Sequence, residues 1–142
     1  MEEQITSLLL STNAYKKSKS IHIYKSLRDE VNTFYILNDA YKSGKLIYFP
    51  TPDPYDNEVT DIVIVPGRKF DRQLTRHGRG GGYYDRFLCN TSAIKIGICY
   101  HAQLCDRLVR KPHDIPMDII VTEKRILGIA NEYWAKKKGT VS

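Results

Sequence analysis

The sequence contains few cysteines, and their arrangement suggests neither a cross-link nor a metal site. Cys89, Cys99 and Cys105 are its three cysteines; their number is odd and none forms a CxxC pair. This pattern argues against both a disulfide framework and a zinc site, so we expect three free thiols that are buried like small hydrophobic residues, in a reducing compartment. Long apolar runs are also missing, because no segment approaches the roughly 18 to 20 residues that span a bilayer.

The first residues, MEEQITSLLLST, lack the basic start and the apolar stretch of a secretory signal. We therefore expect a cytoplasmic protein. The 142 residues, of which 42% are hydrophobic and 27% charged, predict a single compact domain over 1–142.

Hydrophobic patterning predicts alternating strands and helices. Expected strands are 20–27, 45–49, 61–65, 93–100 and 117–122. Expected helices are 3–11, 33–44, one opening with YYDRFL at residue 83, a short one at 101–108 and one at 127–139. The run DIVIV (61–65) is typical of a strand covered on both faces. Alternation of this kind predicts a layered α/β/α domain around a mostly parallel sheet.

Basic residues and glycines concentrate between Val65 and Arg86, in the segment VPGRKFDRQLTRHGRGGGYYDR. Its six basic and two acidic residues give a net charge of +4, out of +6 for the whole chain. A loop that leaves the carboxyl end of a central strand lies where open α/β sheets bind ligands. Glycines let backbone N–H groups approach an anion, and arginines can add contacts to phosphate oxygens.

These features favour a polyphosphate-binding loop, although a mobile basic loop is the alternative. The segment is no Walker A motif, because no GK[ST] follows it. A second alternative is binding of single-stranded RNA, since GRGGGYYDR is similar to an arginine-glycine segment. Such segments usually repeat in disordered surroundings, whereas this one occurs once between expected elements.

Two blocks of the sequence together resemble the 5-formyltetrahydrofolate cyclo-ligase family, also called methenyltetrahydrofolate synthetases. The segment after DIVIV matches the family pattern PGxxFD followed by RxGxGxGYYD. The segment HDIPMDIIVTE (113–123) matches the later pattern HDxxxDxxxTE. An earlier segment, YKKSKSIHIYKSLRDEVNT, is also similar, so the resemblance runs from Ala14 to Glu123.

The resemblance implies an ATP-dependent ligase that converts 5-formyltetrahydrofolate to 5,10-methenyltetrahydrofolate, with ATP and Mg²⁺ as cofactors. In that reaction the γ-phosphoryl group is transferred to the formyl oxygen, and the N10 amine then displaces phosphate. The implied catalytic residues are Arg76 and Tyr83. The implied ATP-binding residues are Arg76, His77, Gly78, Arg79, Gly80, Gly81, Gly82, Tyr83 and Tyr84. The implied substrate-binding residues are Lys25, Glu30, Arg79, Gly80, Gly81, Gly82 and Tyr83. The implied metal ligands are Asp85 and Asp118.

Each of these side chains also has a purely structural alternative. Asp85 can complement the dipole of its helix, and Asp118 can be a surface acid at a strand end. Glu30 can close a turn, Tyr83 and Tyr84 can pack in the core, and His113 can order its loop beside Asp114.

The chain departs from the family pattern in three places. The family has a longer first helix that carries a Lys-x-x-x-Arg pair, and a longer segment between its second strand and the strand that corresponds to DIVIV. In addition, His77 replaces a hydrophobic residue. Three hypotheses follow: an active minimal cyclo-ligase, a nucleotide-binding relative without that substrate, or an RNA-binding protein. For the ligase we expect folate and ATP as partners, no membrane or nucleic acid, and a monomer or weak homodimer.

Overall fold

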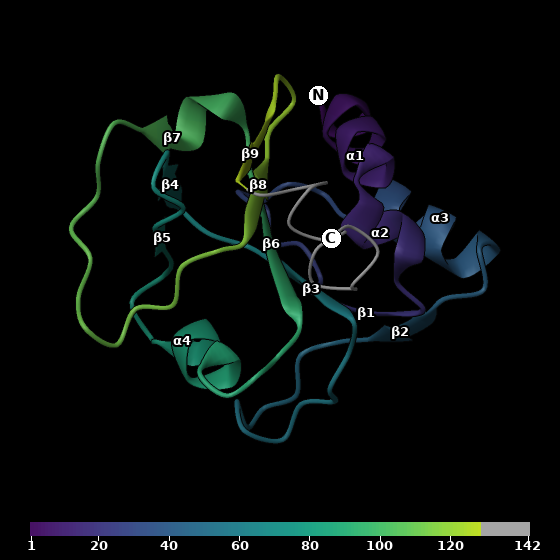
Figure 1. Ribbon diagram of the computed structural model, residues 1–142, viewed down its shortest axis with the longest axis horizontal. Helices are drawn as coiled ribbons and strands as arrows, with labels where there is room; N and C mark the ends of the chain where they lie inside the picture. The colour runs from purple at the N-terminus through teal and green to yellow at the C-terminus, as the bar shows by residue number, and fades with distance from the viewer. Residues whose placement is uncertain (129–142) are drawn as a thin grey trace, which may run out of the picture.

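The computed structural model describes residues 1–128, which form a six-stranded sheet with helices on both faces (Figure 1). The strand order is β2-β1-β3-β6-β8-β9. The strands are β1 (Ser20–Ile23), β2 (Leu46–Tyr48), β3 (Ile62–Val65), β6 (Ile94–Ile98), β8 (Ile119–Val121) and β9 (Ile126–Gly128). Neighbouring strands are parallel except the edge pair of β8 and β9. The predicted layered α/β fold is thereby confirmed.

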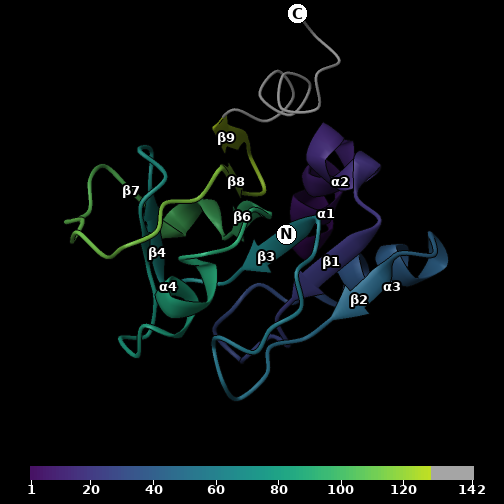
Figure 2. The same cartoon turned by 60° about the horizontal axis from the view of Figure 1, so that its bottom comes forward.

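Helices cover the two faces of the sheet unequally (Figure 2). One face carries α1 (Glu2–Ser11), α2 (Asn13–Lys17) and α3 (Phe34–Lys42), and the other carries α4 (Tyr83–Leu88). The side chains of β3 are all buried, and they alternate between the two cores. Ile62 and Ile64 pack with the first three helices, whereas Val63 and Val65 pack with α4. A strand buried on both faces needs apolar residues at every position, which explains the unbroken β-branched run.

A second, smaller sheet projects from the carboxyl end of β3. It consists of β4 (Lys69–Asp71), β5 (Arg76–His77) and β7 (Leu104–Cys105), in the order β5-β4-β7. β4 and β5 form an antiparallel hairpin, and Phe70 from β4 is fully buried in the core beneath α4. This hairpin carries the glycine-rich loop away from the main sheet.

Several sequence predictions of secondary structure need correction. The strand predicted at 20–27 ends at Ile23, because the chain then turns and the N–H of Glu30 donates to the Leu27 carbonyl (3.1 Å). The helix predicted at 101–108 is only a 3-10 turn, His101–Gln103, since the next residues pair with β4. The helix predicted at 127–139 is wrong at its start, where Ile126–Gly128 pairs with β8. Its remainder lies outside the described residues.

The sequence patterns also missed α2 and the β4–β5 hairpin, both of which are too short to show a period. Within residues 1–128, no helix has the length and apolar character needed to cross a membrane.

Candidate active site

The glycine loop, residues 78–82, lies between β5 and the first residue of α4. The hairpin at its base is closed by the N–H of Arg68, which donates to the His77 carbonyl (2.8 Å). Gly80 and Gly81 are exposed, and Gly82 has a φ of 69°, in the left-handed region that favours glycine. The backbone of the loop is therefore open to solvent at the carboxyl end of the sheet, where α/β folds bind ligands.

Arg76 lies beneath this loop rather than on its surface. Its Nε donates to the carbonyl of Pro66 (2.6 Å), and its guanidinium carbon lies 5.2 Å from the ring centroid of Tyr84. A Cβ on Gly78 would come within 2.5 Å of the Nη2 atom of Arg76. Burial lowers the pKa of Arg76 from its ordinary value, and the nearby charges of Asp85, Glu30 and Asp114 oppose this shift. A guanidinium keeps its charge under such a shift, so Arg76 supplies a fixed positive charge under the loop.

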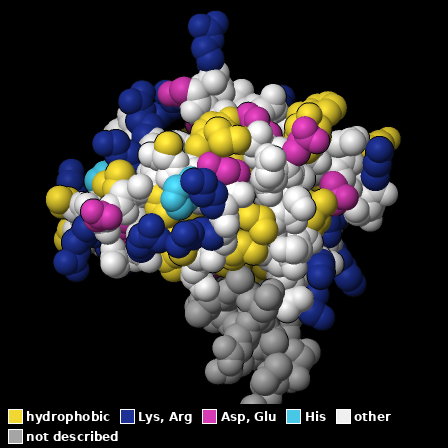
Figure 3. Space-filling view, turned by 90° about the horizontal axis from the view of Figure 1, so that it is seen from above, with side chains coloured by type: hydrophobic (Ala, Val, Ile, Leu, Met, Phe, Trp, Pro, Cys, Tyr) yellow, Lys and Arg dark blue, Asp and Glu magenta, His cyan; other side chains and the backbone are white. Residues whose placement is uncertain are grey.

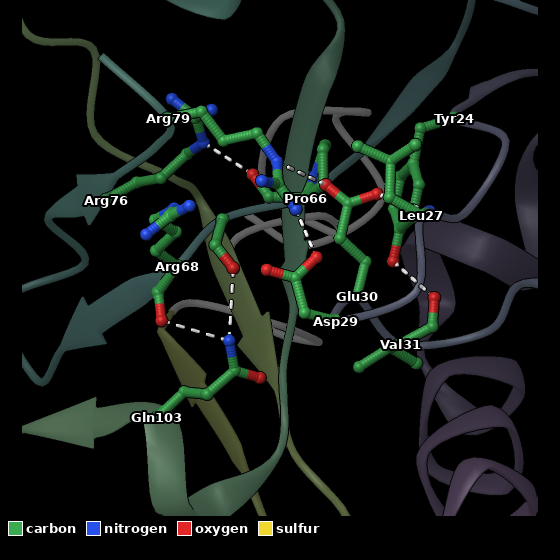
Figure 4. Close-up of polar contacts among 11 residues, drawn as sticks. Tyr24, Leu27, Asp29, Glu30, Val31, Pro66, Arg68, Arg76, Arg79 and Gln103 are labelled. Carbon is green, nitrogen blue, oxygen red and sulfur yellow. Dashed lines mark hydrogen bonds and ion pairs between the residues drawn. The ribbon is translucent and has the colours of Figure 1, made fainter.

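Arg79 extends from the loop toward the turn that follows β1 (Figure 4). It forms an ion pair with Asp29, and its Nε lies 3.8 Å from the Oε2 atom of Glu30. The Oε1 atom of Glu30 accepts a hydrogen bond from the Leu27 N–H (2.8 Å), so Glu30 closes this turn as the structural alternative predicted. Its other oxygen faces the loop. One carboxylate therefore shapes the turn and contacts a cation of the glycine loop.

Lys25 lies on the same edge of the sheet, at the carboxyl end of β1. Its Nζ is 4.9 Å from the ring centroid of Phe49, which follows β2. Tyr24 anchors this connection, since its hydroxyl donates to the Val31 carbonyl (2.9 Å) and its carbonyl accepts from Thr33 (3.2 Å). The structure thus brings the predicted substrate residues Lys25 and Glu30 to the edge that carries the glycine loop.

The two predicted metal ligands do not contact the same part of the molecule. The Oδ1 atom of Asp85 accepts from the Ile115 N–H (3.2 Å), beside Asp114 and near Arg76. The Oδ2 atom of Asp118 instead accepts from the Lys95 N–H (2.8 Å) and lies 3.5 Å from the Lys95 Nζ. Asp118 directly precedes β8 and Lys95 is near the start of β6, so this pair lies at the amino end of the sheet. Asp85 therefore lies on the side of the glycine loop, whereas Asp118 lies at the opposite end of the sheet, so the structure does not bring the two predicted ligands together.

No group of three or more His, Cys, Asp or Glu side chains converges as metal ligands in residues 1–128. Asp114 belongs to the pattern HDxxxDxxxTE but was not predicted as a site residue. Its Oδ2 atom accepts from the N–H of Lys111 (2.8 Å), and its charge acts on Arg76.

His77 points away from the loop. Its Nε2 donates to the carbonyl of Val109 (2.6 Å), which ties β5 to the segment before His113. That segment also borders a groove of about 610 Å³ lined by Asp71, Gln73, Thr75, Arg107, Leu108, Val109 and Arg110. The glycine loop does not line this groove.

The Nε2 atom of His113 lies 3.8 Å from the Oδ1 atom of Asp114. This contact is the one expected if His113 orders its loop.

Several polar residues near the loop were missed by sequence reasoning. The side-chain amide of Gln103 donates to the carbonyls of Gly67 and Arg68 (3.1 and 3.0 Å) and fixes the turn after β3 (Figure 4). Asn57, from the proline-rich segment before β3, donates to the hydroxyl of Tyr83 (3.1 Å). Neither residue belongs to a local pattern, because each acts on a segment distant in the sequence.

Charge is distributed unevenly over the surface. Seen from above, Lys and Arg side chains gather most densely over the left half of this face, beside a histidine (Figure 3). Hydrophobic and acidic side chains are interspersed elsewhere. A surface with locally clustered cations favours anionic ligands.

Three comparisons relate this chain to known proteins. The sequence model of the 5-formyltetrahydrofolate cyclo-ligase family matches residues 54–123. The chain is similar to the 5-formyltetrahydrofolate cyclo-ligase of Mus musculus, with 25% identity over 163 aligned positions, 84% of this chain and 80% of the mouse protein. It is 26% identical to that of Haemophilus influenzae, over 84% of each chain. The structure resembles the Aquifex aeolicus 5,10-methenyltetrahydrofolate synthetase, with a TM-score of 0.77 and 29% identity, over 89% of this chain and 80% of that one.

Proposed function

Because the chain is similar to 5-formyltetrahydrofolate cyclo-ligases in sequence and in fold, we propose that it converts 5-formyltetrahydrofolate to 5,10-methenyltetrahydrofolate with consumption of ATP. The observation that carries the proposal is the solvent-open glycine loop, with Arg76 beneath it and Arg79 reaching from it toward Glu30. This arrangement combines phosphate-binding groups with a substrate edge formed by the β1 turn.

The reaction needs two bond changes at the formyl carbon. Transfer of the γ-phosphoryl group to the formyl oxygen converts that oxygen into a leaving group, and ADP is released. N10 then forms a bond to the formyl carbon, the carbon–oxygen bond breaks, N10 loses its proton, and the oxygen leaves within inorganic phosphate. In such transfers a protein mainly positions the reactants and neutralises charge.

In this chain, Arg76 and Arg79 would neutralise phosphate charge in different ways. Arg76 is held by Pro66 and Tyr84, so its charge is in place before ATP binds. Arg79 is half exposed and paired with acids, so it can transfer its contacts to phosphate oxygens. Tyr83 begins α4 directly after the loop and fixes where the loop ends.

Mg²⁺ would be held on this side of the sheet by Asp85, with Asp114 as the second carboxylate near Arg76. A hard cation of this kind takes carboxylate, phosphate and water oxygens, and it would neutralise the phosphate charge when bound. Asp118 has no part in this proposal, because it lies at the amino end of the sheet beside Lys95, away from the glycine loop.

The test is turnover by the purified chain. ATP, Mg²⁺ and 5-formyltetrahydrofolate are mixed with the protein, and the product is followed by its near-ultraviolet absorbance. We expect Arg79→Ala to lower kcat/KM about 100-fold, the usual effect of losing one charge-stabilising donor. The matched control is Arg72→Ala, an exposed arginine on the β4–β5 turn, which should change kcat/KM less than about twofold. Absence of product with wild-type protein that binds ATP would reject the activity.

A further inference from the structure

We infer that Asn57 is a positioning residue for this site: its side-chain amide fixes the hydroxyl of Tyr83 where the glycine loop enters α4. The inference deepens the proposed function and rests on it. Asn57 belongs to the proline-rich segment between β2 and β3, which is 26 residues from Tyr83 in the sequence. The segment therefore reaches the active site through this contact.

The amide of Asn57 uses all of its hydrogen-bonding positions. Its Nδ2 donates to the carbonyl of Pro54 (2.8 Å), with the Asp53 carbonyl as a longer shared acceptor (3.4 Å), and to the hydroxyl of Tyr83 (3.1 Å). Its Oδ1 accepts from the N–H of Thr51 (3.1 Å) and from the Nε2 of His22 (3.0 Å). Two donor and two acceptor contacts fix the orientation of an amide, because a flip would place like groups against each other. Asn57 is thus locked by three segments of the chain.

Tyr83 completes the network. Its hydroxyl accepts from Asn57 and donates to the carbonyl of Thr51, so both its donor and acceptor roles are taken. Tyr83 follows Gly82, whose left-handed backbone sets the direction of the chain into α4. Fixing the hydroxyl therefore restrains the last part of the glycine loop, because glycine residues alone leave the backbone there flexible.

A buried histidine anchors the network to the sheet. His22, in the centre of β1, is 0% exposed, and its ring centroid lies 4.5 Å from that of Phe87 in α4. Its Nδ1 is buried without a hydrogen-bond partner. An apolar residue would avoid the free-energy cost of an unpaired buried nitrogen, so packing alone gives no reason for histidine here. The contact with Asn57 supplies that reason.

A double-mutant cycle tests whether Asn57 acts through the hydroxyl of Tyr83. We expect Asn57→Ala to lower kcat/KM for 5-formyltetrahydrofolate about tenfold in the wild-type background and less than about twofold in the Tyr83→Phe background. Asn57→Asp keeps the size of the side chain but loses both donors, so it should match Asn57→Ala. The matched control is Asn38→Asp on the exposed face of α3, which should leave kcat/KM unchanged.

Equal losses from Asn57→Ala in both backgrounds would overturn the inference, since a general effect on folding does not depend on the Tyr83 hydroxyl. Circular dichroism checks that each variant is folded. If Asn57→Ala is unfolded, Asn57→Ser carries the same comparison.

A second readout does not require activity. In protein labelled with 3-fluorotyrosine, the ¹⁹F resonance missing from Tyr83→Phe identifies Tyr83. That resonance should shift in Asn57→Asp and stay in place in Asn38→Asp. If the wild-type protein gives no product, the proposed function fails, and the ¹⁹F result still decides the contact. A stationary Tyr83 resonance rejects the inference.

Discussion

The guanidinium of Arg79 forms an ion pair with the carboxylate of Asp29, which lies 50 residues earlier in the chain. Arg79 belongs to the glycine loop and Asp29 to the turn after β1, so the pair joins the phosphate-binding and substrate-facing parts of the site (Figure 4). Both side chains are about half exposed, at 40% and 58%. Such a pair is weak in water and can exchange for a phosphate.

Replacing Asp29 with asparagine should therefore remove the ion pair and leave Arg79 free to bind ATP. We expect Asp29→Asn to lower the KM for ATP about two- to fivefold at low ionic strength, with a smaller effect at high salt. Steady-state kinetics at two salt concentrations measures it. The control is Asp106→Asn, which makes the same change of charge at an exposed position of another loop. An unchanged or higher KM in Asp29→Asn would show that Asp29 does not compete with ATP.

Gly78→Ala should damage the site by crowding. The new methyl group would lie within 2.5 Å of the Arg76 guanidinium, which must then leave its place beneath the loop. We expect kcat/KM to fall at least about tenfold and the free energy of unfolding to fall by about 1 to 3 kcal/mol, as in other overpacked sites. Activity assays and urea unfolding give the two quantities.

Gly81→Ala provides the comparison within the same loop. Its Cβ would meet no heavy atom within 4 Å, so the unfolding free energy should change by less than about 0.5 kcal/mol. Equal destabilisation by both substitutions would mean that Arg76 is not the cause.

The two aspartates predicted as metal ligands should behave differently. Asp118→Ala removes the acceptor of the Lys95 N–H and should lower the free energy of unfolding by about 1 to 3 kcal/mol. The Mg²⁺ concentration that gives half-maximal activity should stay within about twofold. Asp85→Ala should raise that concentration at least about tenfold. Mg²⁺ titrations of both variants separate the roles, and the reverse result would restore Asp118 as the ligand.

Stability should depend on pH through His22. Burial lowers the pKa of His22 from its ordinary value, so the unfolded chain binds a proton that the folded protein excludes. The stability that neutral His22 contributes is complete above about pH 6.5 and is lost as pH falls toward its lower folded pKa. Urea unfolding between about pH 7.5 and 5 should show this loss, with a slope up to about 1.4 kcal/mol per pH unit. His22→Gln should lack that part of the slope, and parallel curves would contradict the assignment.

The amino-acid sequence alone determined the parallel α/β fold, because its signals are local. Four consecutive buried β-branched residues in β3 need apolar cover on both faces. The glycines and arginines after β3 likewise indicated phosphate chemistry through their composition. Helix α3 was also predicted closely, since its apolar spacing and the glycine after it are local features.

The tertiary structure decided which polar groups meet. Asp85, Asp114 and Asp118 look alike in the sequence, but the direction of β8 places Asp118 at the amino end of the sheet beside Lys95. Asn57 and His22 showed no signal at all, because their roles arise from hydrogen bonds between distant segments. Local patterns reflect burial and backbone preference, whereas a site depends on the three-dimensional path that brings separate loops together.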